Sequence, residues 1–181
     1  MKRETSLVAA FLLIAPVLIA QQPAGRRVGL AMVLQLSYGG IKADLVAAAE
    51  KMPEADYGFR PGSMPEVRTF GQLFQHVAAG QWDTCAAVKG VSSRTAEKKQ
   101  EPKTKAEFVK GLVDSFAFCD DAFSSTTDEN ALEFVRQGPN ELTRASLLYG
   151  LLAHNAEMYG IATVYLRVKG IMPPSTERQT K

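Results

Sequence analysis

The chain has two histidines, His76 and His154, and each lies in a segment whose apolar residues recur with the period of a helix. His154 falls within an apolar stripe that includes Leu151 and Tyr165, so we expect it to face a core rather than water. Met158 follows His154 by four residues, which places it on the same helical face. Neutral imidazole is a frequent metal ligand. If the two helices pack side by side, the two histidines could share one metal ion.

The residues that complete this pair decide which ion it could hold. Met158 carries a soft thioether, a poor ligand for zinc, nickel or manganese, and a His/His/Met set would instead favour copper(I). Glu157 lies on the other side of His154 and could turn in as a carboxylate ligand. In the competing interpretation, the histidines hydrogen-bond each other without a metal and Met158 fills the core.

The sequence predicts four helical segments joined by long connections, and two of these helices carry the histidines. Periodic apolar residues predict these helices: Leu30–Met52, Thr69–Val88, Thr104–Phe123 and Leu142–Lys169. Asn140 is a reasonable N-cap for the last helix, and Gly170 is a typical residue after its end. Pro53–Arg68 and Ser124–Asn140 are long enough to cross the end of a bundle. The sequence therefore predicts an all-α four-helix bundle with long crossover connections.

Two motifs in these segments are similar to those of a known family. FRPGSMPEVRTFGQLFQHVAAGQW, from Phe59 to Trp82, resembles the entry into the second helix of the DinB-like (DinB/YfiT) superfamily. HNAEMYGIATVYLRVKGIMPP, from His154 to Pro174, resembles the closing motif of that superfamily. The resemblance covers the predicted bundle, residues 28–174. It implies a divalent-metal site of three ligands, in which His76 and His154 match the first two positions and Met158 stands at the third.

The resemblance also implies what such a site would do. A metal held by three side chains keeps open positions at which it activates water or a thiol, and members of the family include metal-dependent hydrolases and transferases that use low-molecular-weight thiols. Because Met158 replaces the third ligand, we expect a weakened site in a module that binds a small molecule or a protein rather than a competent enzyme. The alternative is a hydrolase or thiol transferase that uses His76 and His154, with water or Glu157 completing the metal sphere. Homodimers are common in the family.

The N-terminus has the pattern of a secretory signal peptide. Lys2 and Arg3 precede the apolar run Leu7–Ala20, which is shorter than the ~20 residues of a membrane span. We expect residues 1–20 to be removed, residues 21–27 to be a linker, and the mature protein to be exported without a stable membrane anchor. An anchor formed by an uncleaved segment is the alternative. Residues 175–181 are predicted to be a loose tail.

The charge balance of the mature chain excludes one class of partner. Removing Lys2, Arg3 and Glu4 leaves 21 − 2 = 19 basic and 19 − 1 = 18 acidic residues, a net charge of +1. Nucleic-acid-binding domains carry a pronounced positive charge. We therefore expect no nucleic-acid partner.

The two cysteines, Cys85 and Cys119, lie on different predicted helices. Their separation does not match a CxxC redox or zinc motif. Cys119 shares the inner face of its helix with Phe108, Leu112 and Phe123, and Cys85 lies on the side of its helix opposite His76. We expect two buried free thiols, with a Cys85–Cys119 disulfide as the alternative that an oxidising compartment would permit.

Overall fold

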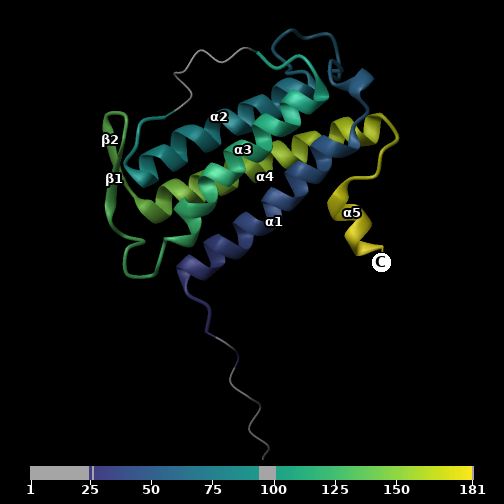
Figure 1. The fold of residues 1–181 in the computed structure, drawn as a ribbon. Coiled ribbons are helices and arrows are strands. Elements are labelled where there is room, and N and C mark those ends of the chain that lie inside the picture. The colour runs from purple at the N-terminus through teal and green to yellow at the C-terminus, as the bar shows by residue number, and fades with distance from the viewer. Residues whose placement is uncertain (1–24, 26, 94–100, 181) are drawn as a thin grey trace, which may run out of the picture.

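The computed structural model describes residues 25, 27–93 and 101–180, and Figure 1 shows their arrangement. The predicted signal peptide, residues 1–20, lies outside these ranges. The elements in chain order are α1 (Leu30–Lys51), a 3₁₀ turn η1 (Glu54–Asp56), α2 (Phe70–Lys89), α3 (Lys105–Ser124), β1 (Phe134–Gln137), β2 (Asn140–Thr143), α4 (Arg144–Val168) and α5 (Pro174–Gln179). The four long helices form the predicted all-α bundle.

The order of the helices around the bundle differs from their order in the chain. α1 packs beside α3 and α4, and α2 also packs beside α3 and α4. α1 and α2 therefore occupy one diagonal of the bundle, and α3 and α4 occupy the other. The connections α1–α2 and α3–α4 each cross an end of the bundle, which explains the length of the chain between these helices.

Local capping fixes where the middle helices begin. The Thr69 side chain accepts a hydrogen bond from the backbone of Gln72, and the Gln72 side chain accepts one from the backbone of Thr69. Thr104 and Glu107 form the same reciprocal capping box at the start of α3. These caps satisfy amides that the first turn of a helix leaves unpaired, so both helices start close to the predicted positions.

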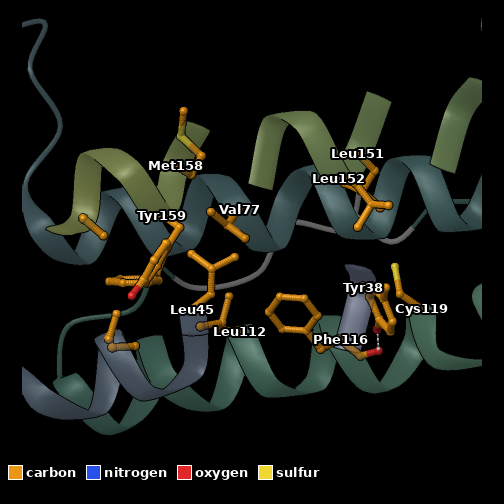
Figure 2. Packing of buried hydrophobic residues seen from close by; sticks show 14 of the residues in the cluster. Tyr38, Leu45, Val77, Leu112, Phe116, Cys119, Leu151, Leu152, Met158 and Tyr159 are labelled. Atoms are coloured by element: carbon orange, nitrogen blue, oxygen red, sulfur yellow. Dashed lines mark hydrogen bonds between the residues drawn. The ribbon is translucent and has the colours of Figure 1, made fainter. Parts of the chain in front are cut away.

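The core lies between the four helices, and Figure 2 shows part of its packing. Phe70, Phe74, Phe116 and Phe123 are fully buried. Tyr38 of α1 stacks on Phe123 with ring centroids 3.9 Å apart. Its hydroxyl donates to the backbone carbonyl of Phe116 (2.7 Å), so this large side chain is buried without losing its hydrogen bond.

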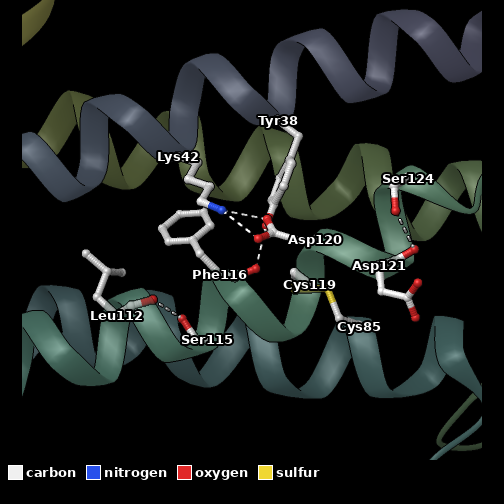
Figure 3. A network of polar contacts seen from close by, with 10 residues as sticks. All are labelled: Tyr38, Lys42, Cys85, Leu112, Ser115, Phe116, Cys119, Asp120, Asp121 and Ser124. Atoms are coloured by element: carbon white, nitrogen blue, oxygen red, sulfur yellow. Dashed lines mark hydrogen bonds and ion pairs between the residues drawn. A yellow bond between two sulfur atoms is a disulfide. The ribbon is translucent and has the colours of Figure 1, made fainter.

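A network of polar contacts between Lys42, Tyr38 and Asp120 joins α1 to α3 at the edge of the core (Figure 3). Lys42 Nζ lies 2.6 Å from Asp120 Oδ1, and the Tyr38 hydroxyl lies 2.9 Å from the same oxygen. Burial and the neighbouring Asp120 carboxylate raise the pKa of Tyr38. The tyrosine therefore remains protonated and acts as a donor at any physiological pH.

α1 is the only helix among the described residues that is long and apolar enough, by length and composition, to cross a membrane. Core helices and signal sequences share this property. Leu30, Val33 and Leu36 are exposed on its N-terminal half. Gly39 and Gly40 are also exposed, and a Cβ at either would meet no atom within 4 Å. They therefore do not serve close helix packing, and α1 runs through them without a break.

The start of the last helix was predicted wrongly. Asn140 is not its N-cap but the first residue of β2, which pairs with β1 in an antiparallel hairpin whose turn contains Gly138 at φ +59°. α4 begins at Arg144, and the side chain of Thr143 caps it by accepting a hydrogen bond from the Ser146 amide (3.2 Å). Strands of four residues are too short to give a recognisable alternation in the sequence.

Residues 174–179 form the helix α5, so most of the predicted loose tail, residues 175–181, is ordered against the bundle. Arg178 Nη2 lies 2.9 Å from Asp44 Oδ2 on α1, and Glu177 pairs with Lys51. The Tyr159 hydroxyl of α4 accepts a hydrogen bond from the Ser175 amide (2.9 Å). These contacts from two helices hold a segment that has little apolar character of its own.

The expectation of free thiols was also wrong, because Cys85 of α2 and Cys119 of α3 form a disulfide, visible in Figure 3. Their Cα atoms are 5.3 Å apart, within the normal range for a bridge. Both residues are fully buried. The sequence showed that each cysteine faced inward, but only the pairing of α2 with α3 makes these two faces meet.

We predict that replacing both cysteines by alanine lowers the free energy of unfolding by ~2–4 kcal/mol, because the bridge closes a loop with a sequence separation of 34. Urea denaturation measures this change. Dithiothreitol should destabilise the natural protein and leave the double variant unaffected. Equal urea midpoints for the two proteins without reductant would contradict the prediction.

Candidate functional site

The structure brings the two histidines into contact across the interface of α2 and α4. Their Nε2 atoms are 3.0 Å apart, and their rings meet edge to face with centroids at 4.9 Å. Both side chains are half-buried. At this distance one Nε2 must donate a proton and the other must accept it, so the contact requires two neutral rings of opposite tautomer or one neutral and one charged ring.

Gly80, one helical turn beyond His76 on α2, lies against the His154 ring. A Cβ at this position would lie 3.6 Å from Cε1 and 3.7 Å from Nδ1 of His154. The His154 ring therefore lies directly next to the position that a side chain at residue 80 would occupy. A larger side chain than alanine at position 80 would press on this ring, so the glycine is part of the geometry that holds the pair.

The surroundings of His76 favour its neutral form. Burial lowers the pKa of His76, and the charges of Arg68 and His154 lower it further, whereas the Glu157 carboxylate acts in the opposite direction. A neutral imidazole has a lone pair available for a proton or a metal ion. The ring is therefore prepared to act as an acceptor or ligand near neutral pH.

Two of the four residues considered as ligands are placed to hold an ion together. Two bonds of ~2.1 Å at 90–109° separate their donor atoms by ~3.0–3.4 Å, which fits the spacing of the two Nε2 atoms. Met158 is buried on α4, one turn beyond His154, and Glu157 is exposed. No group of three His, Cys, Asp or Glu side chains suited to a metal occurs in the described ranges. The nitrogen ligands available to an ion at this site are the imidazoles of His76 and His154.

A pocket of about 290 Å³ opens beside the histidines. His76 and Gly80 contribute from α2, and Gly150 and Leu151 contribute from α4. The hairpin adds a third side through Gln137 and Leu142. Sequence reasoning missed the residues of the hairpin, because nothing in the short strands predicted that they would lie next to His76.

Two amide side chains are buried in the core on the helices that carry the histidines. Gln81 follows Gly80 on α2, and Asn155 follows His154 on α4. Both are fully buried, and neither amide has a hydrogen-bond partner among the described residues. A buried polar group without a hydrogen-bond partner normally lowers the free energy of unfolding by ~1–3 kcal/mol. The two helices that carry the histidines therefore each bury one amide group in the core.

The sequence profile of the DinB superfamily matches residues 41–162, about two thirds of the chain. This chain therefore belongs to the DinB superfamily, as the two motifs predicted. The matched range includes both histidines, the hairpin and most of α4. The comparison with curated proteins found no match.

Solved structures with the same fold are distant in sequence. A DinB-like protein from Bacillus cereus ATCC 10987 superposes with a TM-score of 0.63 at 16% identity, covering 78% of this chain and 93% of that one. A conserved protein from Enterococcus faecalis gives a TM-score of 0.60 at 12% identity, covering 78% of this chain and 97% of that one. These similarities establish the fold of the bundle.

We predict that the protein loses stability as the pH falls below ~6.5, the ordinary pKa of histidine. The pKa of His76 is lowered in the folded state, so the unfolded chain binds the proton first and acidification favours unfolding. Urea unfolding at pH 7.5 and 5.5 should show a smaller loss in His76→Gln than in the natural protein. Gln75→Ala, at the exposed neighbouring position, should keep the full loss, and equal losses in all three proteins would refute the assignment.

We also predict that Gln81→Met raises the free energy of unfolding by ~1–3 kcal/mol. Methionine has a similar shape and removes the unpaired buried amide of Gln81. Chemical denaturation of the variant measures the gain. Gln75→Met, on the exposed face of the same helix, should change stability by less than ~0.5 kcal/mol. A loss of stability in Gln81→Met would mean that the amide makes a bond of its own.

Proposed function

We propose that this protein is an exported DinB-superfamily domain whose divalent-metal site is reduced to two histidines, and that it acts as a binding module rather than as an enzyme. The observation that carries the proposal is the pair His76–His154, with Nε2 atoms 3.0 Å apart and the thioether residue Met158 one turn further along α4. A soft thioether is a poor third ligand for zinc, nickel or manganese.

Export is supported by two independent features. The first is the charged and apolar pattern of residues 1–20. The second is the buried disulfide Cys85–Cys119, because disulfides persist mainly in oxidising compartments. Low-molecular-weight thiols belong to the reducing cytoplasm, so an exported domain is poorly placed for thiol transfer.

A site with only two imidazole ligands is expected to bind a divalent metal ion with low affinity. If a zinc, nickel or manganese ion binds, His76 and His154 hold it, and water or a carboxylate completes its sphere. Such an ion would supply Lewis-acid activation of a bound molecule. The residues of the chain would fix the orientation of the two imidazoles, and burial lowers the pKa of His76 and so favours its neutral form.

Titration calorimetry of the mature protein with zinc and nickel tests this proposal. We expect the natural protein to bind more weakly than micromolar and Met158→His to bind at least 100-fold more tightly, because it restores a third imidazole. Met172→His, at an exposed position after α4, should leave the affinity unchanged. Stoichiometric micromolar binding by the natural protein, with little gain in Met158→His, would overturn the proposal.

A metal-dependent hydrolase is the second candidate. Its support is the exposed Glu157 carboxylate, three residues after His154 on α4, whose charge raises the pKa of His76 against the larger lowering effect of burial. This function requires that zinc-loaded protein hydrolyses a simple ester such as p-nitrophenyl acetate, and that His76→Ala and Glu157→Gln both abolish the activity. Equal rates in the natural protein and both variants would eliminate it.

A further inference from the structure

The pocket beside the histidines is lined by apolar, hydroxyl, amide and imidazole side chains. The ten residues that line it include no Asp, Glu, Lys or Arg. Leu142, Leu147 and Leu151 give it an apolar surface, and Thr84, Ser146 and Gln137 add hydroxyl and amide groups. A charged ligand would lose water here without meeting an opposite charge from the lining, which is unfavourable.

The size of the pocket restricts the ligand further. A cavity of ~150 Å³ in a protein core is large enough to bind benzene. At about 290 Å³, this pocket can accept a substituted single ring or a molecule of similar bulk. Gly150 and Ser146 are exposed, so the pocket opens to solvent and a ligand can enter without unfolding the bundle.

The hairpin forms a fixed outer wall. In β1, Val135 and Gln137 are half-buried whereas Phe134 and Arg136 are exposed, so alternate residues face the bundle. Leu142 is paired with Val135 in the register and lies on the same face. Arg144, which follows the hairpin, donates from Nη1 to the Val88 carbonyl of α2 (3.2 Å) and from its amide to Glu133 (2.9 Å). A wall fixed in this way is preformed for binding, which limits the entropy lost with the ligand.

We propose that the pocket enclosed by α2, α4 and the β1–β2 hairpin binds a small, neutral and mainly apolar ligand that carries one hydroxyl or amide group. The apolar part lies against the three leucines, and the polar group reaches the edge of the histidine pair or the Gln137 amide. The inference gives a ligand class to the proposed binding module, and in this sense rests on it, but it does not require a bound metal.

NMR spectroscopy of the metal-free protein in EDTA tests the site with p-cresol as the probe. The chain has two histidines, so two imidazole Hε1 signals report on the pocket directly. We expect both signals to shift with saturation at millimolar p-cresol or below, and p-toluate, its charged counterpart, to bind at least tenfold more weakly. No shift of either signal at 10 mM p-cresol, or equal binding of p-toluate, would overturn the inference.

A matched pair of glycines on α4 locates the binding. A Cβ at Gly150 or at Gly160 would meet no atom within 4 Å, but only Gly150 lines the pocket. Gly150→Leu should therefore fill the pocket and weaken p-cresol binding at least tenfold, while Gly160→Leu should stay within twofold of the natural protein. Equal affinities in the two variants would show that p-cresol binds elsewhere.

The two proposals can fail separately. If p-cresol binds as expected but Met158→His does not improve zinc binding, the account of the metal site is wrong and the ligand pocket remains. If the zinc titrations give the expected result and p-cresol does not shift the histidine signals, only the ligand class is wrong.

Discussion

The contact between α2 and α4 brings two imidazole rings within 3.0 Å of each other, and the properties of the site follow from this approach. Gly80 lies against the His154 ring, where a Cβ would make ordinary van der Waals contact and only a side chain larger than alanine would press on the ring. The contact determines how protons are shared between the rings, fixes the distance between the two nitrogen donors, and leaves the pocket beside them. A different crossing of the two helices would separate all three features.

The rest of the fold holds these two helices from outside their interface. The disulfide between Cys85 and Cys119, which are both fully buried, joins α2 to α3. The long connection before α2 is attached to α4, because the Tyr165 hydroxyl donates to the Arg68 carbonyl (2.7 Å). At the other end of the bundle, the hairpin leads directly into α4, whose first residue, Arg144, donates a hydrogen bond to the Val88 carbonyl of α2. The histidine pair is thus placed by rigid elements rather than by a loop, which is what an ordered binding site requires.

Membership of the DinB superfamily accounts for the helical bundle, but it does not by itself assign a reaction. The solved structures compared with this chain are only 16% and 12% identical to it in sequence, and such similarity supports the fold alone. Function must be argued from the side chains at the site. Here they combine two imidazole nitrogens 3.0 Å apart, a buried thioether and a pocket lined without Asp, Glu, Lys or Arg, and the proposed binding role is argued from these features.

The sequence by itself determined the four helices, their approximate limits and the family, because apolar periodicity, capping residues and prolines act over a few neighbouring residues. It also identified His76 and His154 as the pair to consider. Only the tertiary structure decided that Cys85 faces Cys119, that residues 134–143 form a hairpin against the pocket, and that the segment after Pro173 docks on α1. Each of these depends on which faces of separate helices meet, and this is set by the packing of the whole bundle rather than by any local pattern.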